Sequence, residues 1–432
     1  MNRCTLSLIA ALAAPAIASA GDCTPAWQYD IGTPGVAGYA GAFAAWDDGT
    51  GESLYAAGSF TSADGNPASN VARWDGSAWS ALDSSVFASF CNTVMPYDGR
   101  LYVGGAFNGV GGIPGTSTIA SWDGTGWASV GGGITSTVPS VWSMAVYDGK
   151  LIVGGNYLEF GGVADTNYVA AWDGTEWTAV GGGLGGQPGL ANALCMTVYN
   201  GDLYVAGRFD SAGGATVSQI AKWDGSTWSD VGGGITGTQV LGMGVYNGDL
   251  YVTGNFTDAG GVPARGVAKW DGFNWSAVGS GFAGNLYDAI AYDDGSGEAL
   301  YVVGTFTASL AGTPMSKIAR FNGTTWEAVG GGLDAGNAFG LGVWNDGAGE
   351  SLYVGGSFDF ANGIACMGAA QWRGCAVSAC PADLDGSGAV DSTDLAILLA
   401  AWGGPGADFN GSGSTDSADL AIMLAAWGDC PL

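Results

Sequence analysis

The chain has 432 residues, with 39 acidic and 11 basic side chains, no His, and a formal net charge of −28. A surface this acidic repels nucleic acids and anionic membranes, and the absence of His removes the usual serine triad and the commonest metal ligand. Because hydrophobic residues make up 47% of the chain and 18 of them are Trp, the composition predicts a large packed core rather than disorder.

Residues 1–20 predict a secretory signal peptide. Arg3 supplies a positive start, Leu6 to Ala14 form an apolar stretch, and Ala18-Ser19-Ala20 offers a small-residue cleavage site. No later run is long and apolar enough to predict a membrane span. We therefore expect a secreted protein that is extracellular or held at the cell surface.

Export favours disulfides, and seven Cys remain after removal of the signal peptide. Cys23 and Cys375 lie at the two ends of the repeats described below, and Cys380 and Cys430 bracket the last fifty or so residues, so we expect these two pairs. Two further cysteines lie in apolar runs and are expected to be inert buried thiols: Cys91 and Cys195.

A unit of about fifty residues recurs along most of the chain. Its clearest copy runs from Ile220 to Ile235 and contains Trp-Asp-Gly, a second Trp and three consecutive Gly. The core motif recurs with drift, and its first residue is found at Trp74, Trp122, Trp172, Trp223, Trp270, Phe321 and Trp372. Each unit has four short apolar runs separated by Gly, Asn-Gly or Asp-Gly turns, a pattern typical of antiparallel strands joined by hairpins.

Four antiparallel strands per unit correspond to one propeller blade. Three recurring positions each give seven units: the Trp-Asp-Gly motif, the Trp that follows it, and the Leu-Tyr or Leu-Ile pair of the third run. The predicted fold is therefore an all-β, seven-bladed β-propeller of four-stranded blades over residues 21–375. We expect a closed ring rather than an open array, since closure buries the strand edges. The first strand, at Trp27, and the last, near Trp372, either share one blade or simply abut.

The units resemble kelch-like propellers over residues 27–374. The resemblance rests on paired glycines such as Gly104-Gly105 and Gly154-Gly155 and on spaced aromatic pairs such as Trp122 and Trp127. It implies a fold rather than an activity, because propellers include both enzymes and binding proteins. Tryptophans that recur in every unit favour a role as wedges between blades, although exposed tryptophans could also stack on sugar rings.

Three units carry a longer acidic, Gly-rich loop in the second hairpin. The loops start at Asp47, Asp293 and Asn345. They could supply carboxylate and carbonyl oxygens to Ca²⁺, or serve simply as solvated turns.

The last fifty or so residues follow a different pattern. Two twelve-residue segments, starting at Asp383 and Asp408, place oxygen ligands at EF-hand positions with Gly at the sixth position, and each runs into an Ala- and Leu-rich helix. The predicted Ca²⁺ ligands are Asp383, Asp385, Ser387, Ala389 (through its carbonyl), Asp391 and Asp394, and in the second loop Asp408, Asn410, Ser412, Ser414, Asp416 and Asp419.

This duplicated loop–helix unit, over residues 380–430, resembles a type I dockerin. The resemblance implies two Ca²⁺ ions and attachment to a cohesin-like partner on a scaffold, often in polysaccharide-degrading systems. The partner contacts it implies fall at Ser392, Thr393, Ser417 and Ala418. The loops start only 25 residues apart, and the helices lack the Lys or Arg that commonly reaches a cohesin. A calcium-stabilised module for surface retention, or a folded tail, is the alternative.

Two functions follow from these patterns. The first is a secreted calcium-binding protein whose propeller binds a glycan or protein, or has a purely structural role, while the tail attaches it to a partner or surface. The second is a carbohydrate-active enzyme, a glycoside hydrolase or lyase, that uses carboxylates. Acidic residues outside the repeat pattern are the candidates for the second function: Glu159, Asp165, Asp210, Asp258, Asp288 and Asp359. No two of them form a recognisable pair in the sequence, and the regularity of the units favours binding over catalysis.

Overall fold

The computed structural model describes residues 25–28, 35–84, 86–87, 89–134, 139–187, 190–347, 349–374, 382, 384, 389–404, 406–407, 409 and 414–429. The predicted signal peptide and the four cysteines of the two expected disulfides lie outside these residues. The chain divides into two compact units, of which the larger runs from Pro25 to Gly374. The described part of the smaller unit falls between residues 382 and 429.

In the described part of the larger unit, seven sheets each contain a path of four antiparallel strands. The first strands of these paths are β2 (Val36–Asp47), β7 (Cys91–Tyr97), β11 (Val141–Tyr147), β16 (Asn192–Tyr199), β22 (Ile235–Tyr246), β27 (Leu286–Asp293) and β31 (Ala338–Asn345). The second strands are β3 (Glu52–Ala63), β8 (Arg100–Gly105), β12 (Lys150–Gly155), β17 (Asp202–Arg208), β23 (Asp249–Ala259), β28 (Glu298–Gly304) and β32 (Glu350–Gly356).

The third strands are β5 (Val71–Trp74), β9 (Ile119–Trp122), β13 (Val169–Trp172), β20 (Ile220–Trp223), β25 (Val267–Trp270), β29 (Ile318–Phe321) and β35 (Ala369–Arg373). The fourth strands are β6 (Trp79–Ala81), β10 (Trp127–Ser129), β14 (Trp177–Ala179), β21 (Trp228–Asp230), β26 (Trp275–Ala277), β30 (Trp326–Ala328) and, for the last sheet, β1 (Ala26–Trp27). Short strands lie outside these paths: β4 (Asn66–Pro67), β15 (Leu184–Gly185), β18 (Ser211–Ala212), β19 (Ala215–Thr216), β24 (Val262–Pro263), β33 (Phe360–Ala361) and β34 (Ile364–Ala365).

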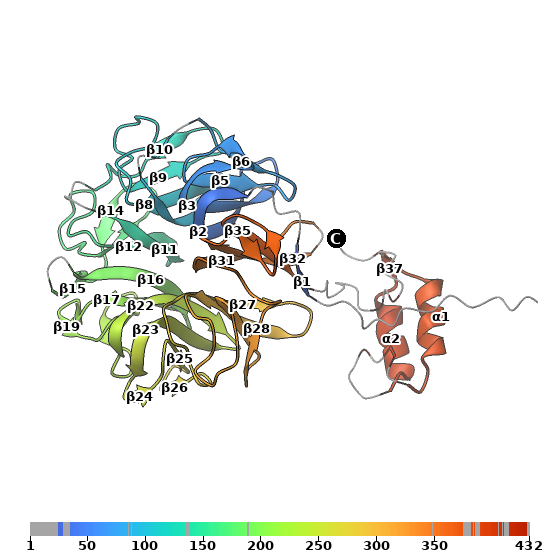
Figure 1. Cartoon of the computed structure of the whole chain (residues 1–432). Helices are drawn as coiled ribbons and strands as arrows, with labels where there is room; N and C mark the ends of the chain where they lie inside the picture. The colour runs from blue at the N-terminus through green and yellow to red at the C-terminus, as the bar shows by residue number, and fades with distance from the viewer. Residues whose placement is uncertain are drawn as a thin grey trace, which may run out of the picture. The chain divides into compact units, whose positions relative to one another are not determined.

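The first strands are the inner strands of the unit. Each contacts the inner strand of the next sheet along the chain, and β31 contacts β2, so the contacts form a cycle. Figure 1 shows β2, β11, β16 and β31 near the middle of the unit and β6, β10 and β26 at its periphery. This is a β-propeller-type arrangement, and the prediction of an all-β unit made of four-stranded antiparallel sheets is confirmed at that level.

The chain ends close the last sheet, which resolves an alternative that the sequence leaves open. Strand β1 pairs with β35, so residues from the start and the end of the larger unit share one sheet. The Trp27 and Trp372 rings meet edge to face, with their centroids 5.1 Å apart. The Trp27 indole donates to the Gly330 carbonyl at 3.0 Å, which ties β1 to the preceding sheet as well.

The Trp-Asp-Gly motif connects adjacent sheets. The Trp223 and Trp228 ring centroids lie 5.3 Å apart across the turn, and the Trp228 indole N–H donates to the Val180 carbonyl of the preceding sheet at 3.0 Å. The same bond recurs from Trp177, Trp275 and Trp326 to the equivalent Val carbonyls. Apart from the half-buried Trp223, the motif tryptophans are buried, which confirms the wedge prediction over exposed sugar platforms.

The first Gly of the Gly-Gly-Gly segment makes room for this wedge. A Cβ on Gly181 would collide with the Trp223 ring, and the backbone there has a positive φ of +54°. The next residue, Gly182, also has a positive φ, of +83°, but its nearest neighbour would be the Gly213 Cα at 3.7 Å. A Cβ on the third Gly, Gly183, would lie only 2.8 Å from the Asn167 carbonyl oxygen. The first and third Gly are therefore required by packing as well as by backbone conformation, and the second by backbone conformation alone.

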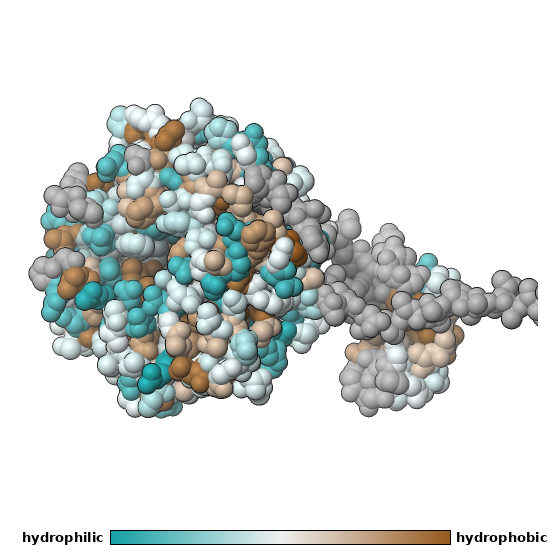
Figure 2. All heavy atoms as spheres, viewed as in Figure 1, coloured by the Kyte–Doolittle hydropathy of each residue, from teal (hydrophilic) through white to brown (hydrophobic). Residues whose placement is uncertain are grey.

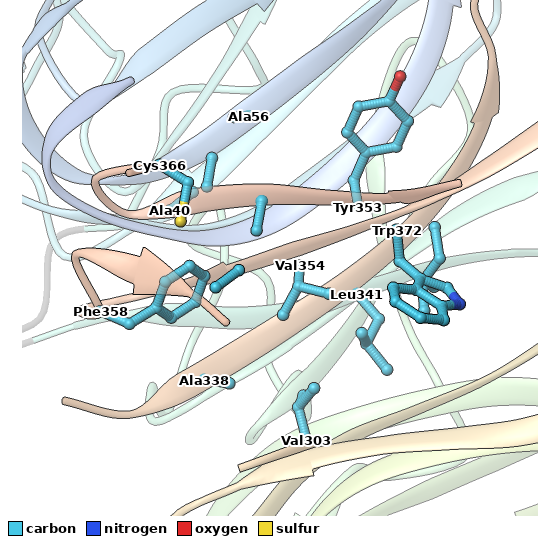
Figure 3. Packing of buried hydrophobic residues seen from close by; sticks show 14 of the residues in the cluster. Ala40, Ala56, Val303, Ala338, Leu341, Tyr353, Val354, Phe358, Cys366 and Trp372 are labelled. Carbon is cyan, nitrogen blue, oxygen red and sulfur yellow. The ribbon is translucent and has the colours of Figure 1, made fainter. Parts of the chain in front are cut away.

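The hydrophobic core is divided into clusters that lie between neighbouring sheets. Figure 3 shows one of them, in which Ala40 and Ala56 from the first sheet meet Leu341, Tyr353 and Trp372 of the last sheet, all of them buried. Such packing makes the unit a ring of mutually supporting sheets. On the surface, Figure 2 shows hydrophilic and hydrophobic residues mixed over the visible face of the larger unit.

In the smaller unit, helix α1 (Ser392–Ala400) contacts helix α2 (Ser417–Ala425), and strand β36 (Ala389–Val390) pairs with β37 (Gly428–Asp429). A small core forms around Val390, Leu398 and Met423. Several large apolar side chains of the helices, and two Trp that follow them, are exposed: Leu399, Ile422, Leu424, Trp402 and Trp427. No helix among the described residues is long and apolar enough to cross a membrane.

Candidate functional site

Each of the seven inner strands carries a β-bulge at the same place. In β27, for example, Leu286 pairs with Gly304 and Asp288 with Val303, so Tyr287 has no partner in the ladder. The bulge residues of the seven sheets are Gly41, Asn92, Trp142, Leu194, Leu241, Tyr287 and Phe339. A bulge turns one side chain out of the regular alternation, and bulges are frequent next to functional sites.

A Gly stands opposite every bulge. A Cβ on Gly207 would collide with the Asn192 carbonyl, and one on Gly304 with that of Asn285. The other members of this set are Gly58, Gly105, Gly155, Gly254 and Gly356. Sequence reasoning missed the bulges, although a recurring Gly inside a strand was a usable signal for them.

All seven bulge residues line one cavity of about 710 Å³ at the centre of the sheets, where side chains from every inner strand converge. The residue before each bulge is apolar and buried in all seven sheets. The bulge residues, by contrast, range from Gly and Asn to Leu, Tyr, Phe and Trp. A regular scaffold therefore presents a varied ring of side chains to one cavity, which makes this cavity the candidate ligand site of the larger unit.

Aromatic side chains form one side of the cavity. Phe339 lies between Tyr39 and Tyr287, with ring-centroid distances of 5.1 Å and 5.2 Å. Trp142 enters from β11 and is 37% exposed, which is unusual in a chain whose repeat tryptophans are buried. These rings offer apolar faces together with phenol and indole hydrogen-bonding groups.

Asp288 is the one charged side chain among the described residues that line the cavity. Its Oδ1 accepts from its own neighbour, the Ala289 amide, at 2.8 Å, and its Oδ2 accepts from the Leu341 amide of β31 at 3.0 Å. Loss of hydration raises the pKa of the Asp288 carboxyl from 3.8 to about 6, against the lowering effect of these two amides. A second cavity, of about 460 Å³, shares Met243, Asp288 and Leu341 with the first, so Asp288 lies where the two cavities meet.

Two buried polar atoms of the cavity lining have no hydrogen-bond partner among the described residues: Ser143 Oγ and Asn192 Oδ1. Unsatisfied buried polar atoms are costly, and a ligand or water that carries hydrogen-bond donors would satisfy them.

The other acidic residues considered for catalysis lie away from the cavity lining. Glu159, Asp165, Asp210 and Asp359 are exposed, and Asp258 is half-buried and accepts from the Gly261 amide at 2.9 Å. The described lining therefore brings Asp288 together with no second carboxylate.

Cys91 and Cys195 are buried free thiols, as expected, and both also line the cavity. Burial raises the pKa of each thiol well above its ordinary value, and the charge of Asp288 raises that of Cys195 further. Both therefore remain protonated at neutral pH, which makes them poor nucleophiles.

The three acidic loops of the larger unit are organised by hydrogen bonds and an internal counter-ion. In the loop that starts at Asp293, the Asp294 carboxylate accepts from the Tyr301 hydroxyl at 2.7 Å and pairs with Arg320 at 3.0 Å. Burial raises the pKa of Asp294, but hydrogen bonds from Ser296 and Tyr301 and the charge of Arg320 together lower it below its ordinary value.

The other two loops repeat this pairing, with Asp48 beside Arg73 and Asp346 beside Arg373. The described residues contain no cluster of three or more His, Cys, Asp or Glu side chains that could hold a metal ion. In each of the three loops an Asp carboxylate is thus ion-paired with an Arg of the same sheet.

In the smaller unit, six of the predicted calcium ligands lie outside the described residues: Asp383, Asp385, Ser387, Asp408, Asn410 and Ser412. Of the others, Ala389 lies in β36. Ser414 is half-buried and directly precedes Thr415, whose backbone forms hydrogen bonds with Gly403 and Gly404 just after α1. Asp391 and Asp416 are the N-caps of α1 and α2, and Asp394 and Asp419 complete the two capping boxes.

The two halves of this unit have matching geometry. Asp394 Oδ1 accepts from the Leu384 amide at 2.6 Å and its Oδ2 from the Asp391 amide at 2.8 Å. Asp419 repeats both bonds, with Phe409 and Asp416, each at 2.8 Å. The four residues expected to contact a partner are exposed at the two helix N-termini: Ser392, Thr393, Ser417 and Ala418.

These residues fit a hard cation. The Asp394 and Asp419 carboxylates are fully buried at the ends of their loops. Residues 375–432 contain eight Asp and no Lys, Arg or His. Carboxylate oxygens are the ligands that Ca²⁺ prefers, so Ca²⁺ held by the carboxylates of each loop would offset their negative charge and stabilise the loop–helix junctions.

Comparisons with known proteins identify no family. No protein-family model matches the chain, and no curated protein matches it. Among solved structures, the one described as "YCF48 bound to D1 peptide" is 11% identical and is matched over 71% of this chain and 86% of that chain, with a TM-score of 0.38. No functional inference follows from so distant a likeness.

Proposed function

We propose that this chain is a secreted binding protein that captures a glycan at the central cavity of a seven-bladed, kelch-like β-propeller. The observation that carries the proposal is the ring of seven bulge residues, whose chemistry varies while the scaffold around it repeats. Aromatic faces beside hydrogen-bonding groups suit a sugar, because a sugar ring has an apolar C–H face and a rim of hydroxyls. Trp142, Tyr287 and Phe339 supply the faces, and Asn192 and Ser143 supply buried acceptors.

Binding is better supported than catalysis. Glycoside hydrolysis by the usual mechanism uses a pair of carboxyl groups a few ångströms apart. Asp288 is the one carboxylate in the described lining, and both of its oxygens already accept backbone amides. This arrangement suits recognition of a ligand better than acid–base attack on a glycosidic bond.

The proposed role of the smaller unit is attachment. As a dockerin-like module it would hold two Ca²⁺ ions through the predicted ligands, and its exposed helix N-termini would meet a cohesin-like partner or another surface component. The matched capping boxes and the absence of basic residues support the calcium part of this proposal. The signal peptide expected at residues 1–20 would place the protein outside the cell.

The test is an oligosaccharide panel probed with the full-length protein and two Trp variants. Trp142→Ala removes an aromatic face from the cavity, whereas Trp427→Ala removes a Trp of similar exposure from the smaller unit. We expect the wild type and W427A to bind the same oligosaccharides and W142A to bind them about tenfold more weakly, because truncating a central interface Trp typically costs 1 kcal/mol or more. A blank panel for the wild type, or equal binding by W142A and wild type, would contradict the proposal.

A further inference from the structure

We infer that the central cavity selects a ligand that carries an organic cation, an ammonium group, which the Tyr39–Phe339–Tyr287 ring cluster and Asp288 hold together. The inference rests on the proposed function in that it concerns the same cavity, and it adds the chemical class of the ligand. An amino sugar is a glycan that meets this requirement.

The charge balance of the cavity favours a cation. Asp288 is half-buried, and the described lining offers no Lys or Arg as its counter-ion. Loss of hydration raises the pKa of the Asp288 carboxyl, and a carboxylate that has lost hydration is stabilised by an opposite charge. The chain as a whole, at −28, also raises the local concentration of cations.

The aromatic cluster favours the same kind of ligand. Three contiguous rings, with Phe339 5.1 Å from Tyr39 and 5.2 Å from Tyr287, form a wall of π faces and edges in the cavity that Asp288 lines. Ring faces attract ammonium groups, and sets of such rings recognise quaternary ammonium ligands. Tyr287 precedes Asp288 in the chain, so the bulge of β27 brings ring and carboxylate to the cavity together.

Polar groups elsewhere in the lining are consistent with this ligand. Asn192 Oδ1 and Ser143 Oγ are buried without partners, and both can accept from a ligand that brings hydrogen-bond donors. The hydroxyls of an amino sugar would provide such donors while its ammonium lies against the rings.

The experiment compares charged and neutral ligands of the same shape on the full-length protein, by titration calorimetry. Choline and its uncharged isostere 3,3-dimethylbutan-1-ol test charge alone, because the charge of choline is permanent. Trisaccharides of glucosamine and of glucose, with the same linkage, make the same comparison on a glycan, because the 2-hydroxyl of glucose replaces the ammonium group at almost the same size. Asp288→Asn is the test variant, and Asp165→Asn, which removes an exposed charge away from the cavity lining, is its matched control.

We expect the affinity of the wild type and of D165N for choline to be at least about five times their affinity for the uncharged isostere, as a cation–π contact beside a carboxylate predicts. D288N should reduce this preference to less than about twofold, and Phe339→Leu, which keeps apolar volume but removes the ring, should weaken choline binding about threefold. Equal binding of the two isosteres, no detectable choline binding, or a D288N preference equal to that of D165N would each overturn the inference. If D288N does not fold, the comparison on the wild type decides.

The outcomes also separate this inference from the proposed function. Binding of neutral oligosaccharides without preference for choline would leave the glycan function standing and overturn the inference. A clear preference for choline with a blank oligosaccharide panel would support the cation site and contradict the glycan function.

Discussion

Substitution of Gly181 by Ala tests how the repeat holds its sheets together. Gly181 has a φ of +54° and faces the Trp223 ring of the next sheet, with which a Cβ would collide. The matched control is Gly182→Ala, one residue further on, where φ is +83° and the nearest atom to the new Cβ would lie 3.7 Å away. Both variants thus add the same methyl group to a left-handed backbone, but only one of them meets the Trp wedge.

The two costs can be estimated separately. A non-Gly residue in the left-handed region loses about 1 kcal/mol relative to Gly, and this penalty applies to both variants. Inserting a methyl group into a packed contact costs a further ~1–3 kcal/mol, and this penalty applies to Gly181 alone. We therefore expect G181A to lower the free energy of unfolding by about 2–4 kcal/mol and G182A by about 1 kcal/mol.

Urea denaturation followed by Trp fluorescence and circular dichroism would measure both variants against the wild type. The expected order of midpoints is wild type, then G182A, then G181A. If G181A is no less stable than G182A, backbone conformation alone explains the Gly-Gly-Gly segment, and the role given to the Trp wedge is wrong.

Three further results are expected. Arg320→Met leaves the buried Asp294 carboxylate without its counter-ion and should lower the free energy of unfolding by about 2–4 kcal/mol at pH 7. Because the folded-state pKa of Asp294 is lowered, the ion pair stabilises the fold above about pH 4, and this stabilisation is lost as the pH falls through the lowered pKa. A stability difference between R320M and wild type that persists at lower pH would contradict the reasoning. Trp27→Ala should cost about 3–5 kcal/mol and expose the N-terminus to limited proteolysis, whereas Gln28→Ala should do neither, since Trp27 is buried in the strand that completes the last sheet. Chelation of Ca²⁺ should release about two ions and reduce the helical circular dichroism of the smaller unit, and an unchanged spectrum would count against the calcium proposal.

Much of the fold could be predicted from the repeat, because its signals are local. Asp-Gly and Asn-Gly turns fix hairpins within a few residues, and the Trp223 and Trp228 pair shows its spacing directly in the chain. A closed ring was expected, but the way in which it closes could not be predicted, since Trp27 and Gly330, which are hydrogen-bonded, lie 303 positions apart and no local pattern specifies their contact.

The candidate site was harder to find than the fold. Asp288 was one of six acidic residues that fall outside the repeat pattern, and nothing in the sequence set it apart from the other five. Its position in a shared cavity depends on a bulge, and a bulge is a property of two paired strands rather than of one sequence run. The sequence does not show that Trp142 differs from the other tryptophans. Trp142 is distinguished by its exposure at a bulge, which only the strand register reveals.

The most direct test of the central claim is an alanine scan of the bulge positions with the best-binding oligosaccharide of the panel as ligand. Trp142, Tyr287 and Phe339 would each be changed to Ala, and Val198→Ala, at an exposed position of β16 outside the cavity lining, would serve as the control. Titration calorimetry should show each bulge variant binding about tenfold more weakly or worse while V198A binds like wild type, with the midpoints of urea unfolding showing that all variants fold. Unchanged affinity across the bulge variants would contradict the claim that the seven bulges build the binding site.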